Sequence, residues 1–151
     1  DPTEYLHDEI GYNYLLVNVL AAIGVAKMEQ LQGFLDVRKR IADKYKLGLE
    51  SIKGVAFQKV LPAVQPNYWL FTAKFPKQRE LLAYLNAHHI QARPFWIPMN
   101  QLPMYTSCLY VQKQDVSQEV YKSCISLPSS SNLTEEQQTR VLDVIHSFYA
   151  K

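Results

Sequence analysis

Small and apolar residues recur at helical spacing between residues 18 and 50. Intervals of three, four or seven separate Leu20, Gly24, Met28, Leu31, Leu35, Ala42, Tyr45 and Leu49. This spacing predicts one long helix, with Asn18 as its N-cap or a first-turn residue. Globular helices typically run about 8–20 residues, so a helix of this length is expected to span something larger than its own domain.

The pattern changes after Gly54 to short β-branched and aromatic runs separated by helical ones. Strands are predicted over residues 55–60, 68–75, 91–96 and 124–127, and helices over residues 78–89 and 116–123 and after Thr134. Thr134 and Gln137 form a capping box for the last helix. Three prolines predict an irregular loop from about residue 98 to residue 114. The fold class is therefore α/β in its two-layer α+β form, a small mixed sheet with helices on one face.

Length and composition are those of one soluble domain. The chain has 151 residues, of which 48% are hydrophobic. No apolar run approaches the roughly 18 residues that suggest a membrane span, so no membrane is expected as a partner. Residues 1–4 lack the basic and apolar regions of a signal peptide. Two cysteines are too few for a disulfide scaffold; free thiols are expected, with one bridge possible. We expect a cytoplasmic protein.

Positive charge gathers in the middle of the sequence. Residues 51–113 carry seven Lys or Arg and one acid, a balance of +6, whereas residues 1–50 and 114–151 each carry −2. Such an excess could attract an anionic ligand, or it could be an ordinary solvated lysine surface. Nucleic acid is not expected as a partner, because no basic run exceeds residues 38–40 and no nucleic-acid-binding motif is present.

The usual catalytic and metal-binding motifs are missing from the sequence. No histidine stands with a Cys, Asp or Glu at metal-ligand spacing, so no metal site is expected. There is no nucleophile-elbow motif, and the five glycines form no phosphate-binding loop. The residues by themselves therefore indicate no complete active site.

Two segments are nevertheless unusual in composition. Residues 11–14, Gly-Tyr-Asn-Tyr, place Asn13 shortly before the long helix, where an amide could meet a phosphate. Alternatively, Asn13 bonds its own backbone in a turn. Residues 92–100 surround Arg93 with proline and aromatic side chains, including Trp96. These could form a stacking and anion-binding wall, or they could be core packing at a sheet edge.

The same two segments resemble the DegT-type nucleotide-sugar aminotransferases, which depend on pyridoxal 5'-phosphate (PLP). The resemblance runs in order through residues 7–14, 18–24, 28–31, 66–70, 93–99 and 125–130, with Arg38 and Tyr45 at their expected places. The Asn-Tyr-Trp and Arg-Pro-Phe-Trp sequences are similar to the LegC-like branch, which aminates 4-keto nucleotide sugars for surface glycans.

The resemblance implies the C-terminal small domain of a fold type I aminotransferase. Residues 1–50 would be an interface loop and a long connecting helix, and residues 51–151 the small α+β domain. The Schiff-base lysine and the large PLP-binding domain of the family lie upstream of the matching segment, so the chain alone is expected to be inactive. The whole enzyme would transfer an amino group from glutamate to a 4-keto-6-deoxy nucleotide sugar, as a homodimer.

The resemblance also implies roles for individual residues. Asn13 matches the family asparagine that reaches the partner's PLP phosphate. Arg93, Trp96 and Asn100 match the loop that approaches the sugar nucleotide. The family usually has arginine where this chain has Leu15. That departure keeps an alternative open, in which the chain is a catalytically dead homologue or a stand-alone binding module.

Overall fold

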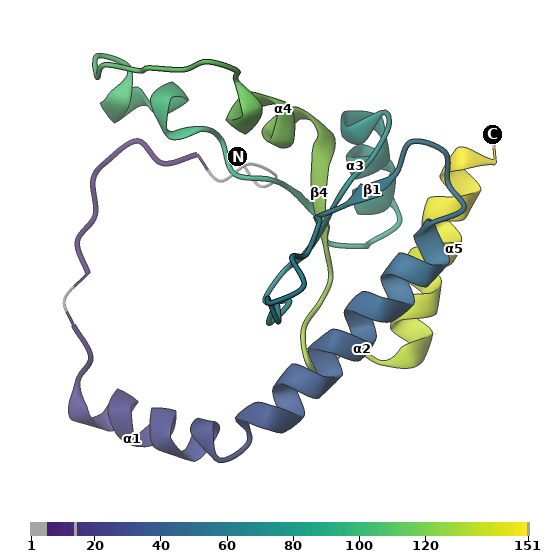
Figure 1. Ribbon diagram of the computed structural model, residues 1–151, viewed down its shortest axis with the longest axis horizontal. Coiled ribbons are helices and arrows are strands. Elements are labelled where there is room, and N and C mark those ends of the chain that lie inside the picture. The colour runs from purple at the N-terminus through teal and green to yellow at the C-terminus, as the bar shows by residue number, and fades with distance from the viewer. Residues whose placement is uncertain (1–5, 14, 151) are drawn as a thin grey trace.

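The computed structural model describes residues 6–13 and 15–150 (Figure 1). The expectations for residues 1–4 and for Tyr14 lie outside the described residues. The helices are α1 (Asn18–Met28), α2 (Leu31–Leu49), α3 (Gln78–Ala87), α4 (Val116–Ser123) and α5 (Glu135–Tyr149). The strands are β1 (Ala56–Phe57), β2 (Phe71–Lys74), β3 (Arg93–Pro94) and β4 (Cys124–Leu127). Two short 3₁₀ helices, η1 (Met99–Gln101) and η2 (Pro103–Tyr105), lie in the predicted irregular loop.

The four strands form one sheet in the order β1-β2-β4-β3. Every neighbouring pair is antiparallel, with Phe71 opposite Leu127 and Arg93 opposite Ser126. The prediction of a mixed sheet is therefore wrong. Because β2 and β3 are both antiparallel to β4, they run in the same direction, but β4 lies between them. The connection through α3 thus joins two parallel strands that are not neighbours.

One face of the sheet is covered by α2, α3 and α5. Alternate strand residues point to that face, so Phe71, Ala73, Ile125 and Leu127 are buried there. They share one hydrophobic cluster with residues 41–49, 81–85 and 141–145 of the three helices. Figure 1 shows α2 and α5 side by side along the sheet. The predicted two-layer α+β fold is confirmed.

The predicted single helix over residues 18–50 is instead two helices. The backbone N–H of Gln30 bonds to the Lys27 carbonyl, three residues back, and this interrupts the helical ladder. The Gln30 side chain lies 3.5 Å from the Ala26 carbonyl, which the ladder would otherwise have used. Neither Gly nor Pro marks this break in the sequence. Helix α1 has no buried residue and projects away from the sheet (Figure 1).

The remaining elements are where the sequence predicts them, and β4 has the predicted bounds, but β1, β2 and β3 are shorter than predicted. Strand β2 begins only at Phe71 because Tyr68 has a left-handed backbone, with φ of 46°, and turns the chain. Strand β3 is two residues long and contains Pro94, which has no N–H for the ladder. The capping box is confirmed: Thr134 accepts from the Gln137 N–H and Gln137 accepts from the Thr134 N–H.

Candidate functional site

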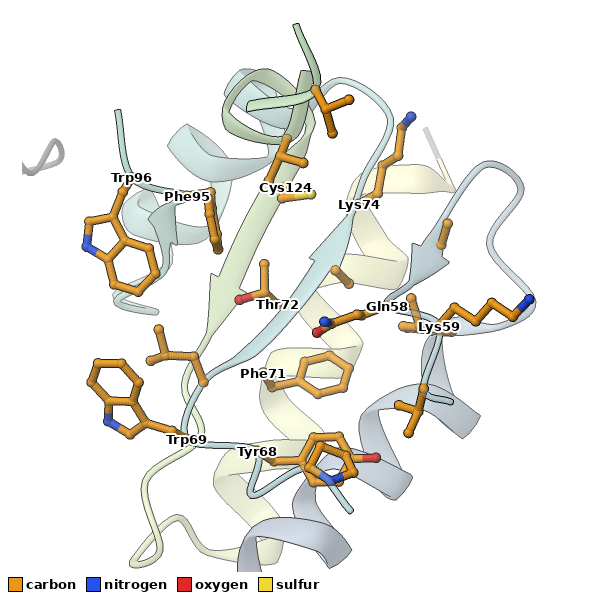
Figure 2. A pocket seen from close by; sticks show the side chains of 18 of the residues that line it. Gln58, Lys59, Tyr68, Trp69, Phe71, Thr72, Lys74, Phe95, Trp96 and Cys124 are labelled. Atoms are coloured by element: carbon orange, nitrogen blue, oxygen red, sulfur yellow. The ribbon is translucent and has the colours of Figure 1, made fainter. Parts of the chain in front are cut away.

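The face of the sheet opposite the helices carries a groove of about 1070 Å³ (Figure 2). The strand residues that alternate with the core residues line its floor, namely Thr72, Lys74 and Cys124. Tyr68 and Trp69, which precede β2, and Phe95 and Trp96, which follow β3, add its aromatic wall. The sheet topology therefore brings two aromatic segments, 26 positions apart in sequence, to one concave surface.

Polar contacts tie the strands beneath the groove to one another and to α4. The hydroxyl groups of Thr72 and Ser126 share a hydrogen bond of 2.8 Å between β2 and β4. Lys74 Nζ lies 2.7 Å from Glu119 Oε1 of α4. This contact raises the pKa of Lys74 and lowers the pKa of Glu119, because each charge stabilises the other. Burial raises the pKa of the Cys124 thiol, so it is a poor nucleophile.

Trp69 and Trp96 form a stacked pair at one side of the groove. Their ring centroids are 6.4 Å apart and the ring planes differ by 28°. Phe95 lies edge-on to Trp96, with its centroid 5.0 Å away. Figure 2 shows the two indoles one above the other, across the groove from Gln58 and Lys59. Trp69 is 62% exposed and Trp96 42% exposed, so both leave indole surface available to a ligand.

Lysine side chains line the groove as well. Lys46 of α2 donates to the Tyr68 hydroxyl at 2.8 Å, and its ammonium lies 4.7 Å from the Tyr68 ring centroid. Lys59 lines the groove too, and so does Lys74, whose charge is paired with Glu119. Among the described residues that line the groove there is no Asp or Glu. The surface is therefore suited to a ligand that combines a flat ring with negative charge.

Of the four predicted site residues, one lines the groove and the other three do not. Arg93 pairs with Ser126 in the sheet, Trp96 belongs to the groove, and Asn100 is half-buried in η1. Asn13 is exposed, and its Oδ1 accepts the Leu15 N–H at 3.2 Å. The local turn considered for Asn13 is thus present. A smaller hollow of about 360 Å³ brings His7 and residues 9–11 to Trp96 and to η2.

Trp69 is a groove residue for which the sequence predicted no site role, and neither did it predict one for Asn67 and Arg38, which hold its backbone. Asn67 Oδ1 accepts the Trp69 N–H at 3.0 Å, while Arg38 Nη1 donates to the Trp69 carbonyl at 3.1 Å. The Asn67-x-Trp69 spacing is a signal of such an Asx turn. The contact from Arg38 spans 31 positions and has no local signal.

Clusters of metal-ligating side chains and membrane-spanning helices are both absent from the described part of the chain. Among residues 6–13 and 15–150, no group of three or more His, Cys, Asp or Glu could hold a metal ion. None of the helices described is long and apolar enough to cross a membrane. Both cysteines are free, Cys108 on the surface and Cys124 half-buried.

Comparison with known proteins decides the family. Residues 1–146 match the DegT/DnrJ/EryC1/StrS aminotransferase family. The chain belongs to this family. EpsN of Bacillus subtilis is 36% identical over 152 residues, which cover 96% of this chain and 39% of EpsN. GDP-perosamine synthase of Escherichia coli O157:H7 is 34% identical, covering 97% of this chain and 40% of that protein.

Solved structures share the fold. DesV of Streptomyces venezuelae, crystallised with a ketimine intermediate, superposes with a TM-score of 0.84 at 23% identity, over all of this chain and 41% of DesV. A DegT-type aminotransferase of Brucella abortus gives a TM-score of 0.82 at 24% identity, over 99% of this chain and 40% of that chain. The family member described here therefore spans about two fifths of the length of its relatives.

Proposed function

We propose that this chain is the C-terminal part of a PLP-dependent aminotransferase acting on nucleotide sugars. The whole enzyme transfers the amino group of glutamate to a 4-keto-6-deoxy nucleotide sugar in surface-glycan biosynthesis, as a cytoplasmic homodimer. Residues 1–50 provide an interface loop and connecting segment, and residues 51–151 provide the small domain. The family match over residues 1–146 carries the proposal. Similarity to GDP-perosamine synthases of Escherichia coli and Vibrio cholerae, 34% and 28% identical, supports the substrate class.

The geometry of the groove agrees with such a substrate. A nucleotide sugar presents a flat base, a charged diphosphate and a polar sugar. The stacked indoles of Trp69 and Trp96 suit the base, and the lysines suit the diphosphate. Arg93 is proposed to add positive charge at the same edge, and Asn100 to face the sugar. The chain's own contribution is to bind and orient the substrate.

PLP, when bound, supplies the carbonyl that carries the amino group and the ring that accepts electrons. The residues of this chain fit a minor role toward it. Asn13 is exposed, and its Oδ1 is engaged by the Leu15 N–H, which leaves the amide nitrogen as the donor that a phosphate needs. We assign Asn13 to the partner's PLP phosphate. The Schiff-base lysine is assigned to the upstream part, so the 151 residues alone are inactive.

The proposal is tested on the longest natural product of the gene that encodes this chain. Purified with PLP, it should show the visible absorbance of enzyme-bound cofactor, and glutamate should shift that band to shorter wavelength. Incubation with 4-keto-6-deoxy nucleotide sugars and glutamate should give an amino sugar detectable by mass spectrometry. The 151-residue chain is the control and should show neither change. A full-length protein that binds no PLP would refute the proposal.

A second candidate is a homologue that keeps the fold and the binding surface without catalysis. Leu15 favours it, because the family usually has arginine there and Leu15 is 90% exposed with φ of 77°. Restoring the arginine with Leu15→Arg in the full-length protein separates the candidates. A large gain in amination from an inactive starting protein would support a degenerate enzyme, and an active starting protein would exclude it.

A further inference from the structure

The exposure of the Trp69 indole has a structural cause. Tryptophan is a large apolar side chain and is highly buried on average in folded proteins. Trp69 is instead 62% exposed, although it directly precedes a strand whose alternate residues enter the core. This exposure leaves most of the indole surface available for contact.

The backbone on both sides of Trp69 is fixed. Its N–H donates to Asn67 Oδ1 at 3.0 Å, and Tyr68 occupies the left-handed region with φ of 46°. Its carbonyl oxygen receives Arg38 Nη1 at 3.1 Å and lies 3.5 Å from Ser129 Oγ. A left-handed backbone at a bulky residue is strained and persists only where its surroundings over-determine it. The backbone that carries the exposed indole is therefore fixed on both sides.

These contacts come from three separate parts of the fold. Arg38 belongs to α2, and Ser129 follows β4 and is buried, with its Oγ also accepting the Phe71 N–H at 3.3 Å. The backbone of Trp69 is thus held by residues of the packed core layer as well as by its own loop. Trp96 reaches the same place from β3, and the two indoles stack. The pair forms an aromatic wall of the groove.

We propose that Trp69 is a substrate-contacting residue, on whose exposed indole the base of the nucleoside diphosphate sugar stacks, and that Arg38 is its positioning residue. This assignment rests on the proposed function for the identity of the ligand. Trp96 extends the stack and the groove lysines, Lys46 and Lys59, face the diphosphate. Because every base has a flat π-face, the wall binds the nucleoside portion without requiring a particular base.

The first test measures binding of free nucleotides to the full-length protein by titration calorimetry. The probes are UDP, GDP and dTDP, with inorganic pyrophosphate as the probe that lacks a base. Trp69→Leu keeps an apolar side chain but removes the flat ring, whereas Trp69→Phe keeps a flat ring. Base stacking on an aromatic side chain is worth a dissociation-constant change of roughly 5- to 150-fold. We expect at least about a 5-fold loss for Trp69→Leu and a smaller one for Trp69→Phe.

Pyrophosphate and a distant variant supply the controls. The affinity for pyrophosphate should be unchanged in Trp69→Leu, because the lost contact is to the base. Leu47→Ala removes another exposed apolar side chain, 71% exposed on α2, and should leave nucleotide binding unchanged. Equal losses for nucleotides and pyrophosphate would assign the effect of Trp69 to general disturbance of the groove and overturn the proposal.

The positioning role of Arg38 is tested through non-additivity. Arg38→Gln removes the charged donor to the Trp69 carbonyl and should weaken nucleoside diphosphate binding several-fold, and Arg38→Lys should restore part of the loss. If Arg38 acts through Trp69, the double variant Arg38→Gln/Trp69→Leu binds no more weakly than Trp69→Leu alone. Additive losses would show that Arg38 acts elsewhere.

Failure of this inference differs from failure of the proposed function. A protein that lacks PLP activity but binds nucleoside diphosphates through Trp69 keeps the inference and loses the aminotransferase. A protein that converts glutamate normally, and whose nucleotide affinity changes less than 2-fold in Trp69→Leu, keeps the aminotransferase and loses the inference. A wild-type protein that binds none of the three nucleotides, or a Trp69→Leu variant altered only in subunit association, also overturns it.

Discussion

Tyr45 is the buried polar group whose replacement gives the sharpest stability prediction. It is fully buried in α2, its hydroxyl donates to the Pro128 carbonyl at 2.8 Å, and its ring packs on Phe71 with centroids 4.9 Å apart. Tyr45→Phe keeps the ring and removes only the donor. Leaving a buried acceptor without its donor costs about 1–3 kcal/mol. Because Pro128 is only half-buried, we expect a loss in the lower part of this range, about 1–2 kcal/mol at pH 7.

The same hydroxyl makes this difference depend on pH. Burial raises the pKa of Tyr45 above its ordinary value of 10.0, because the phenolate would be poorly solvated. A group with a raised folded-state pKa stabilises the fold below its unfolded pKa and loses that contribution as the pH rises. Each pH unit above about 10 should therefore remove about 1.4 kcal/mol from the wild-type chain. Tyr45→Phe has no such loss, so the two free energies of unfolding should converge near pH 11.

Urea unfolding followed by circular dichroism measures this at pH 7, 9, 10 and 11. Every other tyrosine is common to both proteins, so the difference in free energy isolates Tyr45. Tyr12→Phe, at a position 78% exposed, is the matched control and should match the wild type throughout. A difference that stays constant from pH 7 to pH 11 would refute the reasoning about burial. Equal stability at pH 7 would refute the reasoning about the hydrogen bond.

Three further predictions concern the last helix, the cysteines and the groove. Thr134→Ala removes the capping box and should lower the free energy of unfolding by about 1 kcal/mol, while Thr134→Ser should not; equal melting temperatures would contradict this. Iodoacetamide at pH 8 should label exposed Cys108 before Cys124, because burial raises the pKa of the Cys124 thiol; equal rates by mass spectrometry would be evidence against it. Lys74 lowers the pKa of Glu119 in the folded protein. The ion pair therefore stabilises the fold at pH values above the pKa of Glu119 in the unfolded chain. This stabilisation is lost as the pH falls through the lower pKa of the folded state. The stability gap to Glu119→Gln should thus shrink below about pH 4.5, and a gap that persists at pH 3 would count against the ion pair.

Local sequence patterns predicted which helices and strands form better than they predicted where each one begins and ends. The capping box at Thr134 is encoded within four residues, and the structure confirms it. The late start of β2 depends on the left-handed backbone at Tyr68, which hydrophobic alternation does not reveal. The break before α2 depends on Gln30, whose helix propensity is good and whose neighbours include no Gly or Pro. Both misses are conformations of single residues within otherwise regular patterns.

The candidate site was predictable where its residues are neighbours in sequence. Arg93 and Trp96 stand three positions apart among prolines and aromatic residues, and this composition pointed to the loop. The backbone carbonyl of Trp69 is instead held by Arg38, 31 positions earlier, and by Ser129, 60 positions later. Such contacts exist only once β2 and β4 are paired. No short stretch of sequence contains these contacts. The place of Trp69 in the aromatic wall could therefore be recognised only in the folded structure.

The pairing of α2 with α5 sets a waiting time during synthesis. Gln138 donates to the Ile41 carbonyl at 2.7 Å and His146 lies 2.8 Å from the Gly48 carbonyl, contacts that span 97 and 98 positions. At about 5–20 residues per second, a ribosome needs about 5–20 s to bring α5 to an α2 that has already emerged. Until then the apolar face of α2 has no partner from α5. A chaperone that binds nascent chains would meet this domain with that face open until α5 has been made.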